Sequence, residues 1–217
     1  QAPNEPKAAG QGRVFVNFDG EQLSDGWDDS TTNTTQIGQL AGNFAAYGDG
    51  AKRDATMQAV REDWEAYNVI ITETRPASGD YTMCMTGPTN PFGGGVLGIA
   101  PLDCDDSQTP NNIVYAFHSA NDQFDASTQA TTIGQEVAHS YGLDHQLTPE
   151  DPMTYLEYDG DREFQDQMAD CGEFESRDCG IDGSVCRDGQ NSVAVLTGRL
   201  GKRDAEGSNA APGLPTT

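Results

Sequence analysis

The stretch that most constrains this chain is an eleven-residue run at positions 135–145, which reads Gln-Glu-Val-Ala-His-Ser-Tyr-Gly-Leu-Asp-His. Two of the three histidines in the protein, His139 and His145, fall inside it. On a helix, Gln135 and His139 project from one face with about 5–6 Å between their Cβ atoms, so both side chains can reach one ion. Gly142 can take the positive φ that ends a helix and turns the chain back. The run therefore predicts a metal site built from Gln135, His139 and His145.

Glu136 leaves the same helix beside these expected ligands. A carboxylate in that place can take the proton of a metal-bound water and later deliver it to a leaving amine. Each of these residues taken alone is more simply read as an ordinary surface or core residue of an amphipathic helix. Their combination favours metal-assisted hydrolysis, with Glu136 as the general base.

Four positions match the H-E-x-x-H-x-x-G-x-x-H signature of the metzincin metallopeptidases, namely Glu136, His139, Gly142 and His145. The run therefore resembles that family, and it looks closest to the gametolysin-type branch, which carries Gln where the other metzincins have the first histidine. The resemblance implies that the amide oxygen of Gln135 is the first ligand, neutral like imidazole but a weaker donor. It also implies weaker metal binding than three histidines would give.

A second match lies at Asp151-Pro152-Met153-Thr154-Tyr155. In metzincins a methionine follows the third histidine and forms a turn beneath the metal, and several branches have a tyrosine two residues later. The resemblance implies that Met153 forms this hydrophobic floor without being a ligand. It implies that Tyr155 binds the metal or stabilises the oxyanion. The next loop, residues 157–167, is expected to shape the specificity pocket.

Upstream of the run, glycines lead into a short apolar segment made of Gly95, Val96, Leu97, Gly98, Ile99 and Ala100. The segment is similar to the glycine-flanked edge strand of metzincins, which lies antiparallel to the peptide substrate. Such a strand binds the main chain of the substrate by extending the sheet, with little regard to sequence. An ordinary edge strand is the simpler alternative.

The order of the other patterns predicts an α/β (α+β) fold with a single mixed twisted sheet and helices packed on it. Strands are expected at residues 13–19, 69–72, 81–85, 96–100 and 113–117. Helices are expected at residues 37–47 and 57–67, where apolar residues are spaced 3, 4, 3. The helix that carries the ligands should begin near Ser127, and Asn191 should cap a short final helix.

The polar stretch at residues 21–36 is expected to be a surface loop. In domain terms, we expect a flexible lead-in at residues 1–12, a metzincin-like catalytic domain at residues 13–204 and a linker-like tail at residues 205–217.

Five cysteines occur, at positions 84, 104, 171, 179 and 186. None forms a C-x-x-C pair, which argues against a zinc ribbon or a thioredoxin-like site. Disulfides are the expected use in a secreted protein. Cys84 and Cys104 lie near the ends of two extended segments and are expected to pair. Of Cys171, Cys179 and Cys186, two are expected to pair and one to be left over.

The net charge of −23, with 35 acidic and 12 basic residues, argues against nucleic acid as a partner. The acidic clusters at residues 103–106 and 159–161 could hold Ca²⁺, but neither has EF-hand spacing, and a well-solvated surface is the favoured reading. No apolar run approaches the ~18 residues that span a bilayer. No signal-peptide pattern opens the chain, so we expect any such peptide to have been removed.

These features together predict a secreted, monomeric zinc endopeptidase that acts on proteins or peptides, with Ca²⁺ as a second candidate ion. Two alternatives stay open. One is a metzincin relative that binds metal but cleaves nothing and acts as a binding module, which Gln135 keeps open. The other is a calcium-stabilised acidic surface protein, which rests on charge alone. His118, the third histidine, is an alternative first ligand, although a structural or surface role is expected for it.

Overall fold

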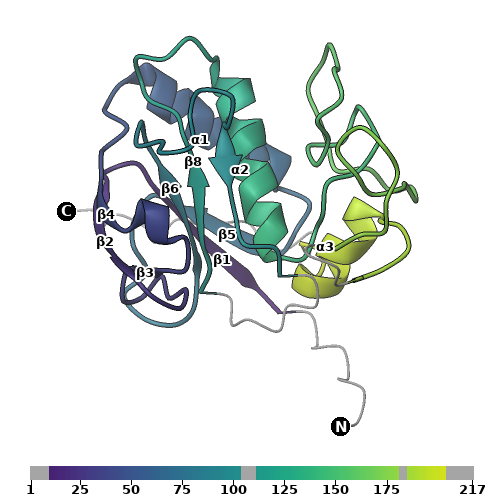
Figure 1. The fold of residues 1–217 in the computed structure, drawn as a ribbon, viewed down its shortest axis with the longest axis horizontal. Helices are drawn as coiled ribbons and strands as arrows, with labels where there is room; N and C mark the ends of the chain where they lie inside the picture. Colours follow the sequence, from purple (N-terminus) through teal and green to yellow (C-terminus); the bar gives the residue numbers. More distant parts are fainter. Residues whose placement is uncertain (1–9, 104–110, 181–184, 204–217) are drawn as a thin grey trace, which may run out of the picture.

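The computed structural model describes residues 10–103, 111–180 and 185–203. A mixed five-stranded sheet forms the centre, with strand order β5-β1-β6-β8-β7 (Figure 1). The strands are β1 (Gly12–Asn17), β5 (Val69–Thr72), β6 (Thr82–Thr86), β7 (Gly98–Ile99) and β8 (Ile113–Ala116). The first four in this order run parallel, and β7 pairs antiparallel with β8 at the edge. The predicted strands and the mixed α/β class are confirmed.

The central strands are buried on both faces, which explains why they read as continuous apolar runs. In β1, Val14 and Val16 belong to a core on one face, whereas Phe15 belongs to a second core on the other. In β8, Val114 and Tyr115 are divided in the same way. The sheet therefore needs a covering layer on each side.

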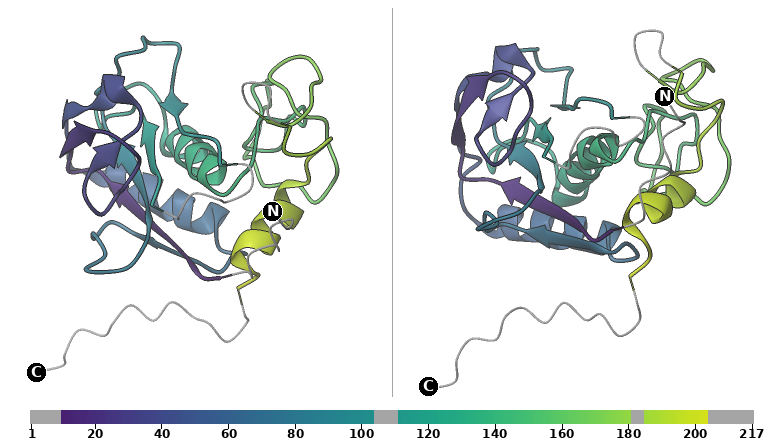
Figure 2. Two further views of the ribbon diagram at one scale, coloured as in Figure 1. Left: turned by 60° about the horizontal axis from the view of Figure 1, so that its bottom comes forward. Right: turned by 90° about the horizontal axis from the view of Figure 1, so that it is seen from below.

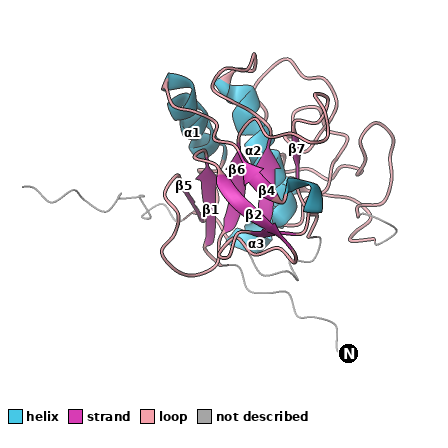
Figure 3. Cartoon of the chain, turned by 60° about the vertical axis from the view of Figure 1, so that its left-hand side comes forward, coloured by secondary structure: helices cyan, strands magenta, loops and turns pink. Residues whose placement is uncertain are grey.

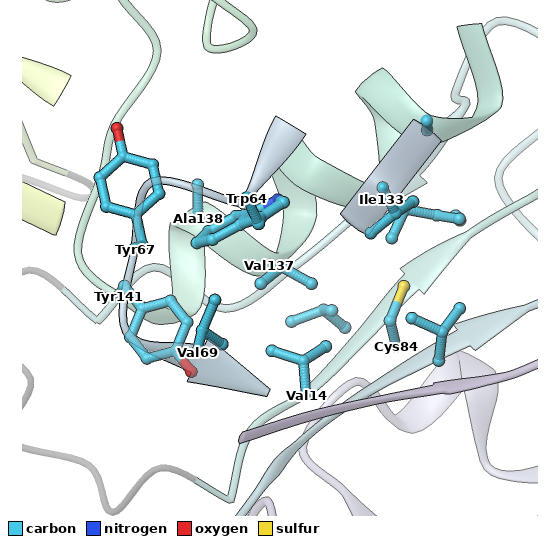
Figure 4. Packing of buried hydrophobic residues seen from close by; sticks show 14 of the residues in the cluster. Val14, Trp64, Tyr67, Val69, Cys84, Ile133, Val137, Ala138 and Tyr141 are labelled. Carbon is cyan, nitrogen blue, oxygen red and sulfur yellow. The ribbon is translucent and has the colours of Figure 1, made fainter. Parts of the chain in front are cut away.

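Two helices cover the first face, α1 (Ala51–Asp63) and α2 (Ala126–Ser140) (Figure 2). Trp64, at the end of α1, and Val137 of α2 lie over Val14 of the sheet (Figure 4). The short helix α3 (Ser192–Leu200) buries Leu196 and Leu200 in the same core. Helix α2 confirms the helix predicted to begin near Ser127, and α3 confirms the short final helix capped by Asn191. The helix predicted at residues 57–67 is present as α1, but it begins six residues earlier, at Ala51, and ends at Asp63. No helix in the described part of the chain is long and apolar enough to cross a membrane.

A second, small sheet covers the other face, with strand order β3-β2-β4 (Figure 3). Its strands are β2 (Glu21–Asp25), β3 (Thr34–Thr35) and β4 (Gly42–Phe44). Leu23 and Phe44 pack with Tyr115 of the central sheet. The predictions of a single sheet and of a loop over residues 21–36 are therefore wrong. Leu23 is the one buried residue of β2, so the strand has almost no apolar pattern to read.

The predicted helix over residues 37–47 is also wrong. The segment forms a 3₁₀ turn (Gly38–Leu40) and then β4. Leu40 and Phe44 enter the core on one side of the central sheet, while Tyr47 enters the core on the other. One helix face cannot serve two cores on opposite sides of a sheet. The spacing of apolar residues correctly indicated which residues are buried but predicted the wrong secondary structure for them.

The cysteine pairing differs from the prediction. Cys84 is a free thiol at the centre of β6, fully buried between the sheet and α2 (Figure 4). Its side chain faces the core, where burial raises its pKa to about 12, so the expected bond to Cys104 is wrong. Cys171 and Cys179 form a disulfide, as one of the expected alternatives. Cys186 is disulfide-bonded too, so it is not the cysteine left over. Cys104 lies outside the described residues, as do residues 1–9 of the expected lead-in, residue 204 and the whole expected tail at residues 205–217.

Candidate active site

Helix α2 carries three of the expected site residues, Gln135, Glu136 and His139. Its start is fixed by Asp125, whose carboxylate accepts a hydrogen bond from the Thr128 amide at 2.8 Å. Its apolar residues pack against the central sheet, so its position relative to β8 and β7 is set by the core. The helix is therefore a rigid support for the site.

The end of α2 makes the sharp turn that the sequence predicts at Gly142. This residue has φ of +94°, and its amide donates to the His139 carbonyl at 3.0 Å. The Leu143 amide donates to the Ala138 carbonyl at 3.1 Å. These two bonds form a Schellman motif, in which a glycine takes the left-handed conformation at little cost. The turn brings His145 back, and its Nε2 lies 3.2 Å from Nε2 of His139.

The hydrogen bonds of the two imidazoles define which nitrogens carry protons. Nδ1 of His139 lies 2.7 Å from the Leu143 carbonyl oxygen, which only accepts. Nδ1 of His145 lies 3.1 Å from a carboxylate oxygen of Glu173. Both Nδ1 atoms therefore donate, and in the neutral rings both Nε2 atoms hold lone pairs. Burial, followed by the neighbouring His145, lowers the pKa of His139 to about 3, so this ring is neutral.

Two lone pairs that face each other at 3.2 Å repel unless a proton or a metal cation lies between them. Two nitrogen ligands at the usual Zn–N distance of ~2.0–2.1 Å in a tetrahedral site are about 3.3–3.4 Å apart. The spacing and the donor chemistry of His139 and His145 therefore fit a zinc ion. Within residues 10–103, 111–180 and 185–203, no three His, Cys, Asp or Glu side chains form a metal site. Among these described residues, a third protein ligand would have to be of another type, such as an amide.

The carboxamide of Gln135 is oriented by the segment that contains Met153. Its Nε2 donates to the Pro152 carbonyl at 2.9 Å, which leaves Oε1 as the free acceptor. An amide held in this way presents an oxygen, which is the atom that a metal would bind. Gln135 is thus suited to be a ligand.

A cleft of about 660 Å³ is lined by Gln135, Glu136 and Tyr155. Residues 95–98 of the expected substrate strand also line it, whereas Ile99 and Ala100 do not. Three residues of the 157–167 loop also line the cleft, Tyr158, Gly160 and Arg162. The structure therefore brings most of the expected substrate and catalytic residues around one cavity.

Glu136 is the buried acid of this cleft, with 4% of its surface exposed. Burial raises its pKa to about 8. A carboxyl group with a strongly raised pKa in a cleft is a candidate for acid–base chemistry, because its proton affinity then matches that of the reacting groups. A nearby cation would favour its ionised form.

Tyr155 connects the cleft with the histidine pair. Its ring centroid lies 4.4 Å from that of His145, and the side chain is half exposed. Burial, then the charges of Glu136 and Glu173, raise the pKa of its hydroxyl. The phenol therefore stays protonated and can donate a hydrogen bond in the cleft. Phe174, which is exposed, packs beside it with the ring centroids 6.1 Å apart.

Met153 is fully buried in the main core. Its carbonyl accepts a hydrogen bond from the Gln146 amide at 2.9 Å, directly after His145. Its own amide donates to the buried carboxylate of Asp151 at 2.9 Å. The turn at Met153 thus fixes the chain that follows the second histidine.

Sequence reasoning missed the charged residues that hold His145. Arg177 binds both carboxylate oxygens of Asp144, at 2.6 and 3.0 Å, and an oxygen of Glu173 at 2.7 Å. The hydrogen bonds from Arg177 lower the pKa of Glu173 to about 2, so that residue is a permanent acceptor for His145. Asp144 also accepts the amide of His145 at 2.7 Å. Apart from the position of Asp144 beside His145, no sequence signal points to this network.

His118 is not part of the site. It is buried, with Nε2 3.1 Å from the Thr132 hydroxyl and Nδ1 3.3 Å from a carboxylate oxygen of Asp122. Both contacts lie away from the His139–His145 pair, which supports the structural role over the ligand role. Of the acidic clusters considered for Ca²⁺, residues 104–106 lie outside the described residues, and Asp161 accepts a hydrogen bond from Ser127 at 2.9 Å.

No model of a known protein family matches the chain, and a search of curated proteins finds no match either.

Proposed function

We propose that the protein is a secreted zinc-dependent endopeptidase of the metzincin type. The observation that carries this proposal is the 3.2 Å separation of the His139 and His145 Nε2 atoms, each with its lone pair available. The buried Glu136 and the half-exposed Tyr155 line the cleft beside His145, where they can supply a general base and a hydrogen-bond donor. The disulfide Cys171–Cys179 is in keeping with an oxidising compartment.

His139, His145 and the amide oxygen of Gln135 would hold the metal. Zinc bound there would polarise the scissile carbonyl and lower the pKa of a water molecule to about 7. Glu136 takes a proton from the attacking water and delivers it to the departing amine nitrogen, so one carboxylate acts first as base and then as acid. Tyr155 donates a hydrogen bond to the oxyanion of the tetrahedral intermediate.

The substrate would bind along β7. This strand pairs with β8 on one side, and its segment lines the cleft on the other. A peptide added antiparallel to β7 would lie across Glu136 and Tyr155. Its affinity would come largely from main-chain hydrogen bonds, with side-chain preference set by the cleft wall.

The decisive experiment compares the wild-type protein with Glu136→Ala, purified identically. We expect the wild type to bind one zinc ion and to cleave a denatured protein, with cleavage stopped by a chelator and restored by zinc. Glu136→Ala should bind zinc equally and lose at least about a hundredfold in kcat, since general base catalysis contributes about 10²–10⁴.

Two results would overturn the proposal. Loss of zinc from Glu136→Ala would make this residue a ligand rather than a base. Stoichiometric zinc without cleavage by the wild type would favour the alternative of a non-catalytic metal-binding module, which the amide at position 135 supports.

The role of Gln135 is tested by Gln135→His, because imidazole is a better donor to zinc than an amide oxygen. We expect zinc to bind about tenfold more tightly, which equals ~1.4 kcal/mol. Competition with a chromophoric chelator measures this constant. An unchanged constant would show that position 135 does not contact the metal.

A further inference from the structure

Gly98 of β7 lies directly against the side chain of Glu136. A Cβ atom added at Gly98 would come within 2.7 Å of both Cγ and Cδ of Glu136 and closer still to its Oε1. The three nearest atoms all belong to Glu136, so the glycine leaves space for this side chain. The contact joins the edge strand of the central sheet to the acid of the candidate active site.

The glycine is required by this contact and not by its backbone. Gly98 is not among the glycines with positive φ, so an alanine there would have an ordinary backbone conformation. In the same segment Gly94 also lacks a positive φ, and a Cβ at that position would meet nothing within 4 Å. Gly94→Ala is therefore a matched control for the effect of the substitution itself.

Neither partner of the contact can move away without cost. Gly98 pairs with Ala116, and the Phe117 amide donates to the Leu97 carbonyl at 2.8 Å, so β7 is fixed to β8. Glu136 lies on α2, whose neighbouring residue Val137 is buried in the main core. The part that can move most easily is the Glu136 side chain, by rotation about its own bonds. A methyl group at position 98 would therefore displace the carboxylate.

We propose that Gly98 is a positioning residue, which fixes the carboxylate of Glu136 in the cleft through the absence of a side chain. The catalytic consequence rests on the function proposed above. Ordinary contacts of a Cβ begin at 3.4 Å, so the carboxylate carbon of a Gly98→Ala variant must shift by about 0.7 Å to restore an ordinary contact. A misplacement of about 1 Å can cost about 10²-fold in rate.

The first arm of the test is kinetic. Gly98→Ala is expected to lower kcat by about 10–100-fold with KM changed less than about threefold and zinc content unchanged, because the base is displaced while the ligands stay in place. Gly94→Ala should keep the wild-type kcat. Wild-type kcat in Gly98→Ala would overturn the inference. A rise in KM at unchanged kcat would also overturn it, since that would mean the strand acts on substrate binding alone.

The second arm is independent of activity. Gly98→Ala should lower Tm by about 2–4 °C or more when Glu136 is present. In the Glu136→Ala background the same substitution should change Tm by less than about 1 °C, because the opposing atoms are gone. Equal changes in Tm with and without Glu136 would show that the cost of Gly98→Ala does not come from contact with Glu136, and would overturn the inference. If the wild type cleaves nothing, the proposed function fails, and this cycle still decides whether Gly98 positions Glu136.

Discussion

Glu173 is the residue whose removal most directly tests the support of the metal site. It accepts the Nδ1 proton of His145 at 3.1 Å and is itself held by Arg177. An acceptor in this place fixes the ring and raises its basicity as a ligand. Glu173→Gln should weaken zinc binding by about 10–100-fold, measured by competition with a chromophoric chelator.

Glu175→Gln is the control for this change, since it removes the same charge from an exposed position on the same loop. It should leave the dissociation constant within about twofold, because exposed charges are screened. Equal weakening by both variants would mean that the loop acts through its overall charge and not through the bond to His145.

Asp63, at the end of α1, gives the clearest pH dependence of stability. It lines a second cavity, of about 680 Å³, together with Asp161 and Glu163. Burial, then the charges of Asp161, Glu62 and Glu163, raise the pKa of Asp63 from 3.8 to about 6. A carboxyl group with a raised folded-state pKa stabilises the fold fully below its unfolded value, and this contribution is lost as pH rises through about 6.

Asp63→Asn should therefore raise the free energy of unfolding at pH 7 by about 1–2 kcal/mol, a range already reduced for partial solvent screening. At pH 4 most of the gain should be lost, because Asp63 is then protonated when folded and partly protonated when unfolded. Urea denaturation of the variant and the wild type at pH 4, 5.5 and 7 measures this difference in the free energy of unfolding. A gain from Asp63→Asn that is equal at every pH would contradict the explanation.

Individual site residues differ in how far the sequence reveals them. His139, Gly142 and His145 lie within seven positions, and one helix end with one turn fixes their geometry, so spacing alone predicted the meeting of the imidazoles. Arg177 reaches Asp144 from 33 residues away, through a loop with no periodic pattern. The contact of Gly98 with Glu136 likewise depends on sheet order. Neither could be predicted from local sequence.

Two glycines, one just after the end of α2 and one inside α3, lead to opposite predictions. Gly142 ends α2 with φ of +94°, where an L side chain is strained by about 1–2 kcal/mol. Gly142→Ala should lose about that much stability and also weaken zinc binding, since His145 is displaced. Gly198 lies inside α3, where an added Cβ meets nothing within 4 Å, so Gly198→Ala should gain about 0.5–1 kcal/mol. Urea unfolding and zinc titration of both variants test this.

The variant Gly142→Asn separates the effect of backbone strain at positive φ from the effect of adding any side chain at this position. Asparagine tolerates the left-handed conformation better than alanine, so this variant should keep more stability than Gly142→Ala. The Gly198→Ala variant should bind zinc as the wild type does. If Gly142→Ala were as stable as the wild type, the turn would not need the positive φ.

Helices and strands were predictable from the sequence where the spacing of apolar residues matched the burial of one regular element. Strands β1 and β8 are apolar because both faces are buried, and the stripe of residues 57–67 serves the first core alone. Residues 37–47 have the same helical spacing, yet their side chains enter two cores on opposite sides of the sheet. The segment 21–25 is polar because its strand has one face in solvent. The spacing of apolar residues therefore indicates which residues are buried, whereas tertiary packing decides whether the backbone is a helix or a strand.

The candidate metal site lies where the sheet-and-helix core meets the C-terminal loops of residues 144–190. Gln190 binds both backbone groups of Asp144 at 2.8 Å, and the chain after α3 returns to the sheet, where the Asn68 amide donates to the Gly201 carbonyl at 3.0 Å. The described residues of this region, 144–180 and 185–190, form only isolated β-bridges between α2 and α3, and they depend on such bonds and on the disulfide Cys171–Cys179. An ion shared by His139 and His145 would add a further link between the two parts.

Zinc should therefore stabilise the whole protein. A ligand that binds only the folded state at 100 times its dissociation constant adds about 2.7 kcal/mol. For a chain of this size that amounts to a rise in Tm of about 5–10 °C. Thermal unfolding after chelation, followed by separate addition of Zn²⁺ or Ca²⁺, measures the effect. The shift, and not Tm itself, is the quantity to compare between variants, because substitutions in the site also change intrinsic stability.

Variants of the site residues show whether the rise in Tm on addition of zinc comes from the candidate site. His139→Ala and His145→Ala should lose the zinc shift, since one remaining imidazole binds weakly, whereas Glu136→Ala should keep it because the base is not a ligand. A zinc shift that survives both histidine substitutions would place the ion elsewhere. Stabilisation by Ca²⁺ alone would favour the calcium-stabilised surface protein, because oxygen ligands and not imidazoles select that ion. One set of melting curves thus separates the metal site from the effect of the acidic surface.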